Sequence, residues 1–201
     1  MARVDTYRKN RLVFRAGERS THVYVLESGV VKVFEMSDLG RDTILWFCLP
    51  GEIFGLAEAV AGGWRGVSAQ ACEQSTLLSV PGDQFRQYLA THPQASMLCL
   101  QALSARLRGL GHVLVNFVSD DVHTRIGKLL LRLGARYGSR VGTEIILQIP
   151  LTHQAISDMV GAARPTVSSA LGDFKRKGVL SIDSHRIRIE SEELLNEIRN
   201  G

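Results

Sequence analysis

Residues 151–189 read LTHQAISDMVGAARPTVSSALGDFKRKGVLSIDSHRIRI, and this stretch decides the fold of the second half of the chain. Thr152 stands before an amphipathic run and can cap a helix over 153–160, because its hydroxyl can accept a hydrogen bond from a first-turn amide. Gly161 then permits a sharp turn. A second apolar period predicts a helix over 164–177. The pattern indicates two helices joined by a tight turn.

A short hairpin completes this motif. Gly178 ends the second helix, and residues 180–189 alternate apolar and polar side chains around a turn near 183–184. Helix, turn, helix and hairpin together predict a winged helix-turn-helix. Motifs of this kind place their second helix in the major groove of DNA.

The second helix carries polar side chains at its start and positive charge at its end. Arg164 can read the O6 and N7 atoms of guanine, and serine or threonine hydroxyls can bond base edges or phosphates. A solvated polar face is the alternative for any single helix, but the whole motif favours double-stranded DNA as the partner. The predicted DNA-contacting residues are Thr152, His153, Gln154, Arg164, Thr166, Ser168, Ser169, Lys175 and Arg186.

The first half of the chain has the pattern of a small all-β domain. Between Leu12 and Val80, β-branched and aromatic residues alternate with polar ones between turns such as 37–40, which favours a jelly-roll β-barrel. The segment Phe54–Ala61 breaks this alternation and predicts a short helix. Its amino terminus, with Arg65 beyond it, could hold an anion. A tight barrel corner that binds nothing is the alternative.

A long helix over 92–119 joins the two halves. Its leucines recur at alternating steps of three and four, a heptad seam that requires a partner helix. Gly109 and Gly111 each weaken the helix by about 1 kcal/mol relative to alanine. Two interpretations are open: the glycines allow two helices to approach closely, or they keep the helix marginally stable so that a signal can order it. The seam predicts a dimer interface made of Leu100, Leu103, Leu107, Leu110, Leu114 and Phe117.

These elements predict an α+β chain in three parts. A jelly-roll β-barrel domain covers 1–91, the dimerisation helix covers 92–119, and the winged helix-turn-helix covers 120–201. The net charge of +4 permits nucleic acid as a partner but does not require it.

The composition argues against several other classes of protein. Hydrophobic residues make up 45% of the chain, so we expect a packed core rather than disorder. No secretory signal is visible, and the longest apolar run, Ile44–Leu49, is too short to span a membrane. The cysteines (Cys48, Cys72 and Cys99) are far apart, which fits a reducing cytoplasm and no metal site. We expect a cytoplasmic protein without a membrane segment, metal or required cofactor.

Catalytic signatures are also missing from the sequence. It contains no P-loop, no GxGxxG, no HExxH and no GxSxG motif. A cupin-like metalloenzyme would use the same barrel shape, but it needs several histidines that converge on a metal. The barrel segment offers only His22. We therefore expect no enzymatic activity.

The chain resembles the Crp/Fnr family, named for the cyclic-AMP receptor protein and the fumarate–nitrate regulator. The resemblance runs from about Leu12 to Ile189 and rests on residues 16–18, 23–33, 50–55, 121–126, 151–161 and 164–171. It implies a homodimeric transcription regulator with a sensory barrel that binds a near-palindromic DNA site and works with RNA polymerase. A signal in the barrel would reposition the two recognition helices, which must lie about one DNA turn, roughly 34–36 Å, apart.

The effector pocket that this resemblance implies differs from that of the members that bind cyclic AMP. Leu56 stands where they have a ribose-binding glutamate, and Val67 stands where they have a phosphate-binding arginine. A leucine accepts no hydrogen bond, and a buried phosphate needs an ion partner. We therefore expect another effector, or none, rather than cyclic AMP held by the usual contacts. The candidate pocket residues are Gly55, Leu56, Glu58, Arg65, Ser68, Ala69, Leu110 and Gly111.

The second helix of the motif departs from the family pattern as well. Arg164 matches the guanine-reading arginine, whereas Pro165 and Ser169 replace a glutamate and a second arginine. The half-site should therefore differ but keep some guanine preference. Two other functions stay open, a cyclic-nucleotide sensor and a constitutively active regulator without an effector. The cysteine spacing does not match an iron–sulfur site, and His112 is expected at a surface or interface rather than on haem.

Overall fold

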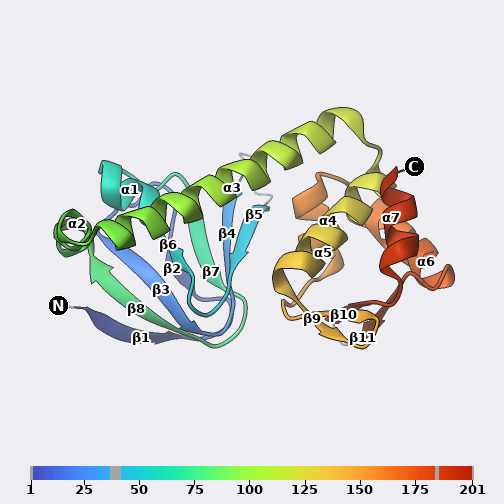
Figure 1. The fold of residues 1–201 in the computed structure, drawn as a ribbon, viewed down its shortest axis with the longest axis horizontal. Coiled ribbons are helices and arrows are strands. Elements are labelled where there is room, and N and C mark those ends of the chain that lie inside the picture. The colour runs from blue at the N-terminus through green and yellow to red at the C-terminus, as the bar shows by residue number, and fades with distance from the viewer. Residues whose placement is uncertain (1, 37–41, 184–185, 201) are drawn as a thin grey trace. The chain divides into compact units, whose positions relative to one another are not determined.

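The computed structural model describes residues 2–36, 42–183 and 186–200 (Figure 1). The chain divides into two compact units, Met1–Leu110 and Gly111–Gly201. The predicted turn at 37–40 and Ser184 of the predicted hairpin turn lie outside the described residues.

The amino-terminal unit contains two four-stranded antiparallel sheets. The first sheet has the order β1-β8-β3-β6, with β1 (Arg3–Tyr7), β8 (Ser75–Pro81), β3 (His22–Ser28) and β6 (Ile53–Phe54). The second has the order β2-β7-β4-β5, with β2 (Leu12–Phe14), β7 (Ser68–Ala71), β4 (Val31–Met36) and β5 (Asp42–Cys48). The predicted jelly-roll β fold is confirmed.

An apolar cluster joins the two sheets. Leu26 and Leu77 come from the first sheet, Phe14 and Val33 come from the second, and all four side chains are buried. Alternation along each strand places them on the inner face. Burying a side chain of this size stabilises the fold by about 1.5–3 kcal/mol. Hydrophobic burial is therefore the main force that holds the sheets together.

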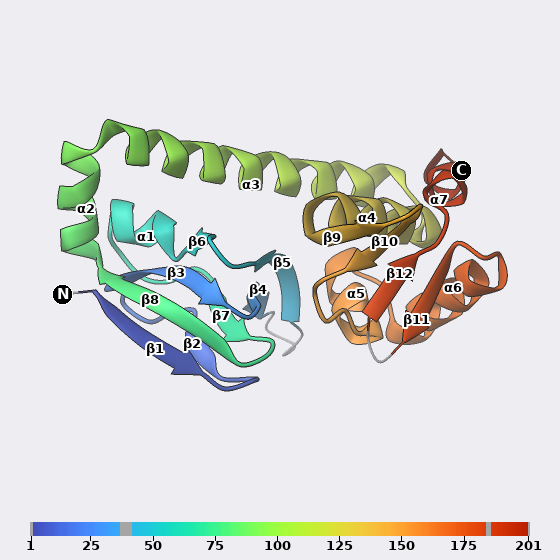
Figure 2. The same ribbon diagram turned by 60° about the horizontal axis from the view of Figure 1, so that its bottom comes forward.

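Strand β1 is absent from the sequence prediction. Its residues are mostly exposed and include the ion pair between Arg3 and Asp5, so it shows little apolar alternation. In the structure, β1 pairs with β8 from Arg3 opposite Ser79 to Tyr7 opposite Ser75 (Figure 2). The Ser79 hydroxyl also donates a hydrogen bond to the Arg3 carbonyl oxygen (3.1 Å). Backbone pairing rather than burial therefore keeps this edge strand in place.

Three helices pack around a second apolar cluster of the same unit. They are α1 (Leu56–Ala61), α2 (Gly82–Thr91) and the long helix α3 (Pro93–Ser119). Leu56 and Ala59 of α1 are buried there with Phe85 of α2. Leu103 of α3 packs against this cluster and is partly buried. Leu103, predicted to lie at a dimer interface, therefore also contacts the core of its own unit.

The rest of the heptad seam on α3 is open to solvent. Leu100, Leu107 and Leu114 are 56%, 72% and 68% exposed. Among the 27 residues of α3, none is fully buried. The two compact units meet between Leu110 and Gly111, inside this helix. The domain limits predicted at 91/92 and 119/120 stay predictions.

The carboxy-terminal unit combines four helices with a four-stranded antiparallel sheet. The helices after the end of α3 are α4 (Val122–Tyr137), α5 (His153–Val160), α6 (Arg164–Arg176) and α7 (Glu192–Asn200). The sheet has the order β11-β12-β10-β9, with β11 (Leu180–Asp183), β12 (Arg186–Ile189), β10 (Glu144–Leu147) and β9 (Gly138–Val141). The predicted winged helix-turn-helix is confirmed.

The wing and the last helix differ from the sequence prediction. The hairpin of β11 and β12 does not stand alone, because Ile189 and Arg188 of β12 pair with Ile145 and Ile146 of β10. Helix α7 was not predicted. It packs extensively against α4 and buries Leu195. Both additions extend the core through partners that are distant in the sequence.

Gly161 forms the turn between α5 and α6 in a conformation that favours glycine. Its φ of 60° and ψ of 42° are left-handed, and its N–H donates to the Ser157 carbonyl oxygen. A Cβ atom at this position would overlap the ring of Phe117, which lies in the same unit. Backbone conformation and packing therefore both require glycine.

Gly161→Ala should lower the free energy of unfolding of the carboxy-terminal unit by about 2–5 kcal/mol. The left-handed conformation contributes about 1–2 kcal/mol, and the clash with Phe117 contributes about 1–3 kcal/mol. Gly178→Ala is the matched control, because Gly178 has a φ of 70° but nothing within 4 Å of an added Cβ. It should cost only about 1–2 kcal/mol. Hydrogen exchange of the α5 and α6 amides measures both values, and equal losses would contradict the packing role of Phe117.

Candidate nucleic-acid interface and barrel interior

Helix α5 holds α6 through an apolar contact and fixes which face of α6 points outward. The Thr152 hydroxyl accepts a hydrogen bond from the Ala155 N–H (3.0 Å), which confirms the predicted cap. Ile156 and Val160 of α5 are buried, as are Val167 and Leu171 of α6. The exposed face of α6 is therefore the one opposite these apolar residues.

Four of the predicted DNA-contacting residues lie exposed on α6. They are Arg164, Thr166, Ser169 and Lys175. Pro165 stands in the first turn, as predicted. The basic groups of Lys175 and Arg164 lie at opposite ends of the helix. These four residues offer one arginine fork, two hydroxyls and an ammonium group, which are the groups that proteins use on base edges and phosphates.

Two other predicted contact residues bind each other. The Nδ1 atom of His153 lies 2.9 Å from the Ser168 hydroxyl oxygen, and this hydrogen bond links α5 to α6. Ser168 is only partly exposed, whereas the neighbouring Ser169 is exposed. The pairing was missed because a serine on the polar face of a helix gives no signal of a partner fifteen positions earlier. Ser168 therefore links the two helices of the motif, and its contact with DNA stays a prediction.

The remaining predicted contacts lie outside α6, on α5 and on the wing. Gln154 is exposed, and its side-chain amide donates to Asp158 (2.7 Å). Arg186 is exposed on the wing strand β12. Its neighbour Arg188 pairs with Glu144 (2.8 Å), which reduces the positive charge that the wing presents.

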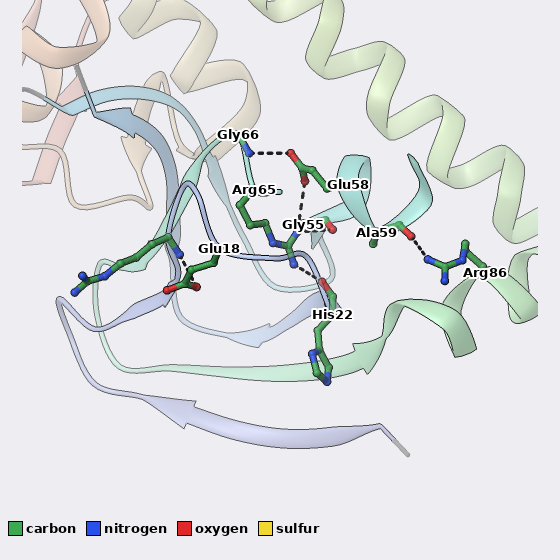
Figure 3. A network of polar contacts seen from close by, with 9 residues as sticks. Glu18, His22, Gly55, Glu58, Ala59, Arg65, Gly66 and Arg86 are labelled. Atoms are coloured by element: carbon green, nitrogen blue, oxygen red, sulfur yellow. Dashed lines mark hydrogen bonds and ion pairs between the residues drawn. The ribbon is translucent and has the colours of Figure 1, made fainter. Parts of the chain in front are cut away.

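The barrel interior contains a buried arginine (Figure 3). Arg65 is 3% exposed. Its Nη1 donates to the Gly55 carbonyl oxygen (2.9 Å) and lies 3.5 Å from a carboxylate oxygen of Glu58. Its Nη2 donates to the carbonyl oxygen of His22. Burial lowers the pKa of Arg65, and the charge of Glu58 opposes that shift. Three of the predicted pocket residues, Gly55, Glu58 and Arg65, are thus in direct contact.

The other predicted pocket residues have structural partners. Leu56 is 2% exposed within the second apolar cluster. Ser68 accepts a hydrogen bond from the Ala16 N–H (3.0 Å), and Ala69 is buried in the first cluster. Leu110 and Gly111 belong to different compact units, so their effector contact stays a prediction.

Sequence reasoning missed the aromatic residues beneath Arg65. The guanidinium carbon lies 4.1 Å from the Phe14 ring centre and 6.0 Å from that of Tyr24. Phe54 stacks on Tyr24, with ring centres 5.4 Å apart. The inward alternation of these strands was visible in the sequence, but the arginine above them was not.

The described residues show few features of other site types. No three His, Cys, Asp or Glu side chains gather there as metal ligands. Burial raises the pKa of the Cys72 thiol to about 11, so it stays protonated at neutral pH. No helix in the described ranges is both long and apolar enough to cross a membrane.

Comparison with known proteins gives matches over both units. A family model described as a cyclic nucleotide-binding domain matches residues 4–92, and one described as a Crp-like helix-turn-helix domain matches residues 124–198. The chain is 31% identical to a CRP-like cAMP-activated global transcriptional regulator of Mycobacterium tuberculosis, over 93% of this chain and 84% of the relative. It is 30% identical to a global nitrogen regulator of Nostoc sp., over 92% of this chain and 84% of the relative.

A solved structure shows the same fold. FixK2 from Bradyrhizobium japonicum matches with a TM-score of 0.86 and 22% sequence identity. The match covers 98% of this chain and 97% of that chain.

Ser168→Ala should lower the free energy of unfolding of the carboxy-terminal unit by about 1 kcal/mol, because it removes the hydrogen bond to His153. Ser169→Ala, one position along the same helix, should change it by less than about 0.5 kcal/mol, because that hydroxyl is exposed. Urea unfolding of the full chain, followed by circular dichroism, measures both. Equal stability of the two variants would show that the His153 contact contributes nothing.

Proposed function

The chain belongs to the Crp/Fnr family of transcription regulators, and from this premise we propose that it acts as a homodimer that binds specific DNA sites. The observation that carries the proposal is the exposed polar face of α6, held outward by its apolar contact with α5. The relatives that it matches are transcriptional regulators, and we propose the same role, without a catalytic activity, for this chain.

The amino-terminal turn of α6 is the proposed reading surface. Arg164 is exposed there and has the planar fork that matches O6 and N7 of guanine. Thr166 and Ser169 supply hydroxyls for neighbouring base edges or phosphates. Lys175 and Arg186 would contact the DNA backbone. Four further residues are proposed to lie at the interface with DNA: Thr152, His153 and Gln154 at the start of α5, and Ser168, which bonds His153.

The proposed dimer forms along α3. Leu100, Leu107, Leu110 and Leu114 leave an apolar stripe at heptad spacing that a second copy of the helix would cover. Phe117 follows at the same spacing and is 41% exposed, but its ring also packs against Gly161 of its own unit. A two-fold dimer would present two recognition helices to a near-palindromic site, with half-sites roughly 34–36 Å apart.

The barrel over 1–91 is proposed as the sensory domain, with 92–119 as the dimerisation helix and 120–201 as the DNA-binding domain. The barrel would respond to a signal or a small effector and reposition the recognition helices. Cyclic AMP held by the usual contacts is not favoured, because the buried Leu56 offers no acceptor for a ribose. The names of two relatives point to different signals, cAMP and nitrogen, so family membership leaves the effector open. RNA polymerase is the proposed partner at the promoter, and the cytoplasm is the proposed location.

Arg164→Ala should weaken binding to the preferred site by about 1–3 kcal/mol and relax one guanine position of the half-site. The measurement is selection from a random DNA library with wild type and variant, followed by affinity titration. Arg140→Ala is the matched control, because Arg140 is an exposed arginine of the same unit that pairs with Glu192. Affinity should also fall with rising salt, because phosphate contacts release counterions. Identical sites and affinities for wild type and Arg164→Ala would remove Arg164 from the interface.

Leu107→Glu should raise the dissociation constant of the dimer at least about tenfold, because the seam would then bury a carboxylate. Ala105→Glu is the control, because Ala105 is exposed on α3 but lies on the side of the helix away from the seam. Sedimentation analysis of the full chain measures both. A monomeric wild type, or a dimer that tolerates Leu107→Glu as well as Ala105→Glu, would contradict an interface along the seam.

A further inference from the structure

The guanidinium of Arg65 contacts protein groups on its face and along its edge. Its face lies over the Phe14 ring, and the ring of Tyr24 is next to it. The edge donates to two carbonyl oxygens, of Gly55 and His22, and faces the carboxylate of Glu58. Stacking on an aromatic ring and bonding at the edge are what an arginine needs when it leaves water. Arg65 is therefore fixed by contacts on its face and along its edge.

The surroundings of Arg65 are shaped for this cation. Gly55 has a φ of 69°, which favours glycine, and a Cβ there would lie 2.8 Å from Nη1 of Arg65, so another residue would also displace the guanidinium. The second carboxylate oxygen of Glu58 faces the Gly66 N–H at 3.4 Å, which directs the other oxygen toward Arg65. The site thus combines an aromatic floor, two carbonyl acceptors and one countercharge.

The backbone of Arg65 is fixed as firmly as its side chain. Its N–H donates to the Glu18 carbonyl oxygen, and its own carbonyl oxygen accepts from the Gly17 N–H, both at 2.8 Å. The Ser20 N–H donates to the Gly63 carbonyl oxygen (3.0 Å) beside this pair. The loop that carries Arg65 is therefore attached to the loop before β3. The backbone position of Arg65 is thus set by hydrogen bonds on both sides of the residue.

These contacts connect Arg65 to the dimerisation helix. Gly55 caps α1 and Glu58 lies on it, so the guanidinium sets the position of this short helix. Leu56 and Ala59 of α1 are buried in the cluster against which Leu103 of α3 packs. Loss of the Arg65 side chain would therefore be expected to shift α1 and, through it, the packing of Leu103 in the seam of α3.

We infer that Arg65 is a built-in ligand of the barrel, which takes the place of a small-molecule effector and keeps α1 and α3 in the DNA-binding arrangement. This inference rests on the proposed function of DNA binding, and it selects the constitutively active regulator without an effector over one that responds to an effector. Arg65 acts as a positioning residue, because it works through α1 and does not touch DNA. The wild type then binds its DNA site with the same affinity in the presence and absence of cyclic nucleotides.

Chemical rescue tests the inference. Arg65→Ala leaves a hollow shaped for a guanidinium, so DNA affinity should fall at least about tenfold and recover when methylguanidinium is added at non-denaturing concentration. Arg86→Ala is the matched control, because Arg86 donates to the Ala59 carbonyl oxygen of the same helix (2.6 Å) but does not lie over the aromatic rings. Methylguanidinium should leave wild type and Arg86→Ala unchanged.

The outcomes separate this inference from the proposed function. If wild type binds no specific DNA under any condition, the proposed function fails, and the inference fails with it. If wild type binds DNA only with a cyclic nucleotide, the proposed function stands and the built-in ligand is wrong. The same holds if Arg65→Ala binds like wild type, or if it is folded and weak but is not rescued.

A measurement on the wild type covers the case in which Arg65→Ala does not fold. The side-chain N–H signals of Arg65 should be shifted by the ring current of Phe14 and protected from solvent exchange in nuclear magnetic resonance spectra. Signals like those of an exposed arginine would overturn the inference without any variant.

Discussion

The apolar stripe on α3 is the constraint on which the rest of the molecule depends. The helix is 27 residues long, none of them is fully buried within one chain, and its leucines recur at heptad spacing. A stripe of this kind is costly in water, and this cost is the basis for the proposed second copy of the helix. Leu103 alone among the seam leucines packs against the apolar cluster of its own unit. The same helix thus packs against the core through Leu103 and exposes its other seam leucines to solvent.

The barrel also buries a charged side chain, Arg65, against an aromatic core. A lone guanidinium among Phe14, Tyr24 and Phe54 would be strongly unfavourable without hydrogen bonds and a countercharge. Two carbonyl oxygens and Glu58 supply these, and Gly55 makes room for them. Leu56, the next residue along the chain, is buried in the second apolar cluster instead of facing this polar group.

The helix-turn-helix shows how stability and recognition share a small surface. His153 and Ser168 were both predicted to contact DNA, yet they bond each other and link α5 to α6. Arg164, Thr166 and Ser169 stay exposed beside them. The hydroxyl that holds the helices together and the hydroxyl that faces outward are adjacent in the sequence, and only the orientation of α6 separates their roles.

The sequence by itself determined the winged helix-turn-helix, the β-rich first half, the long helix and the family. These features depend on local signals, namely the Thr152 cap, the Gly161 turn and the heptad period, which act over a few residues. Tertiary structure alone decided the edge strand β1, helix α7, the four-stranded wing sheet, the inward position of Leu103 and the burial of Arg65. Each of these depends on a partner far along the chain: β8 for β1, β10 for the wing, and Phe14 and His22 for Arg65. Local propensity carries no information about such pairings, because long-range contact in the folded chain is what selects them.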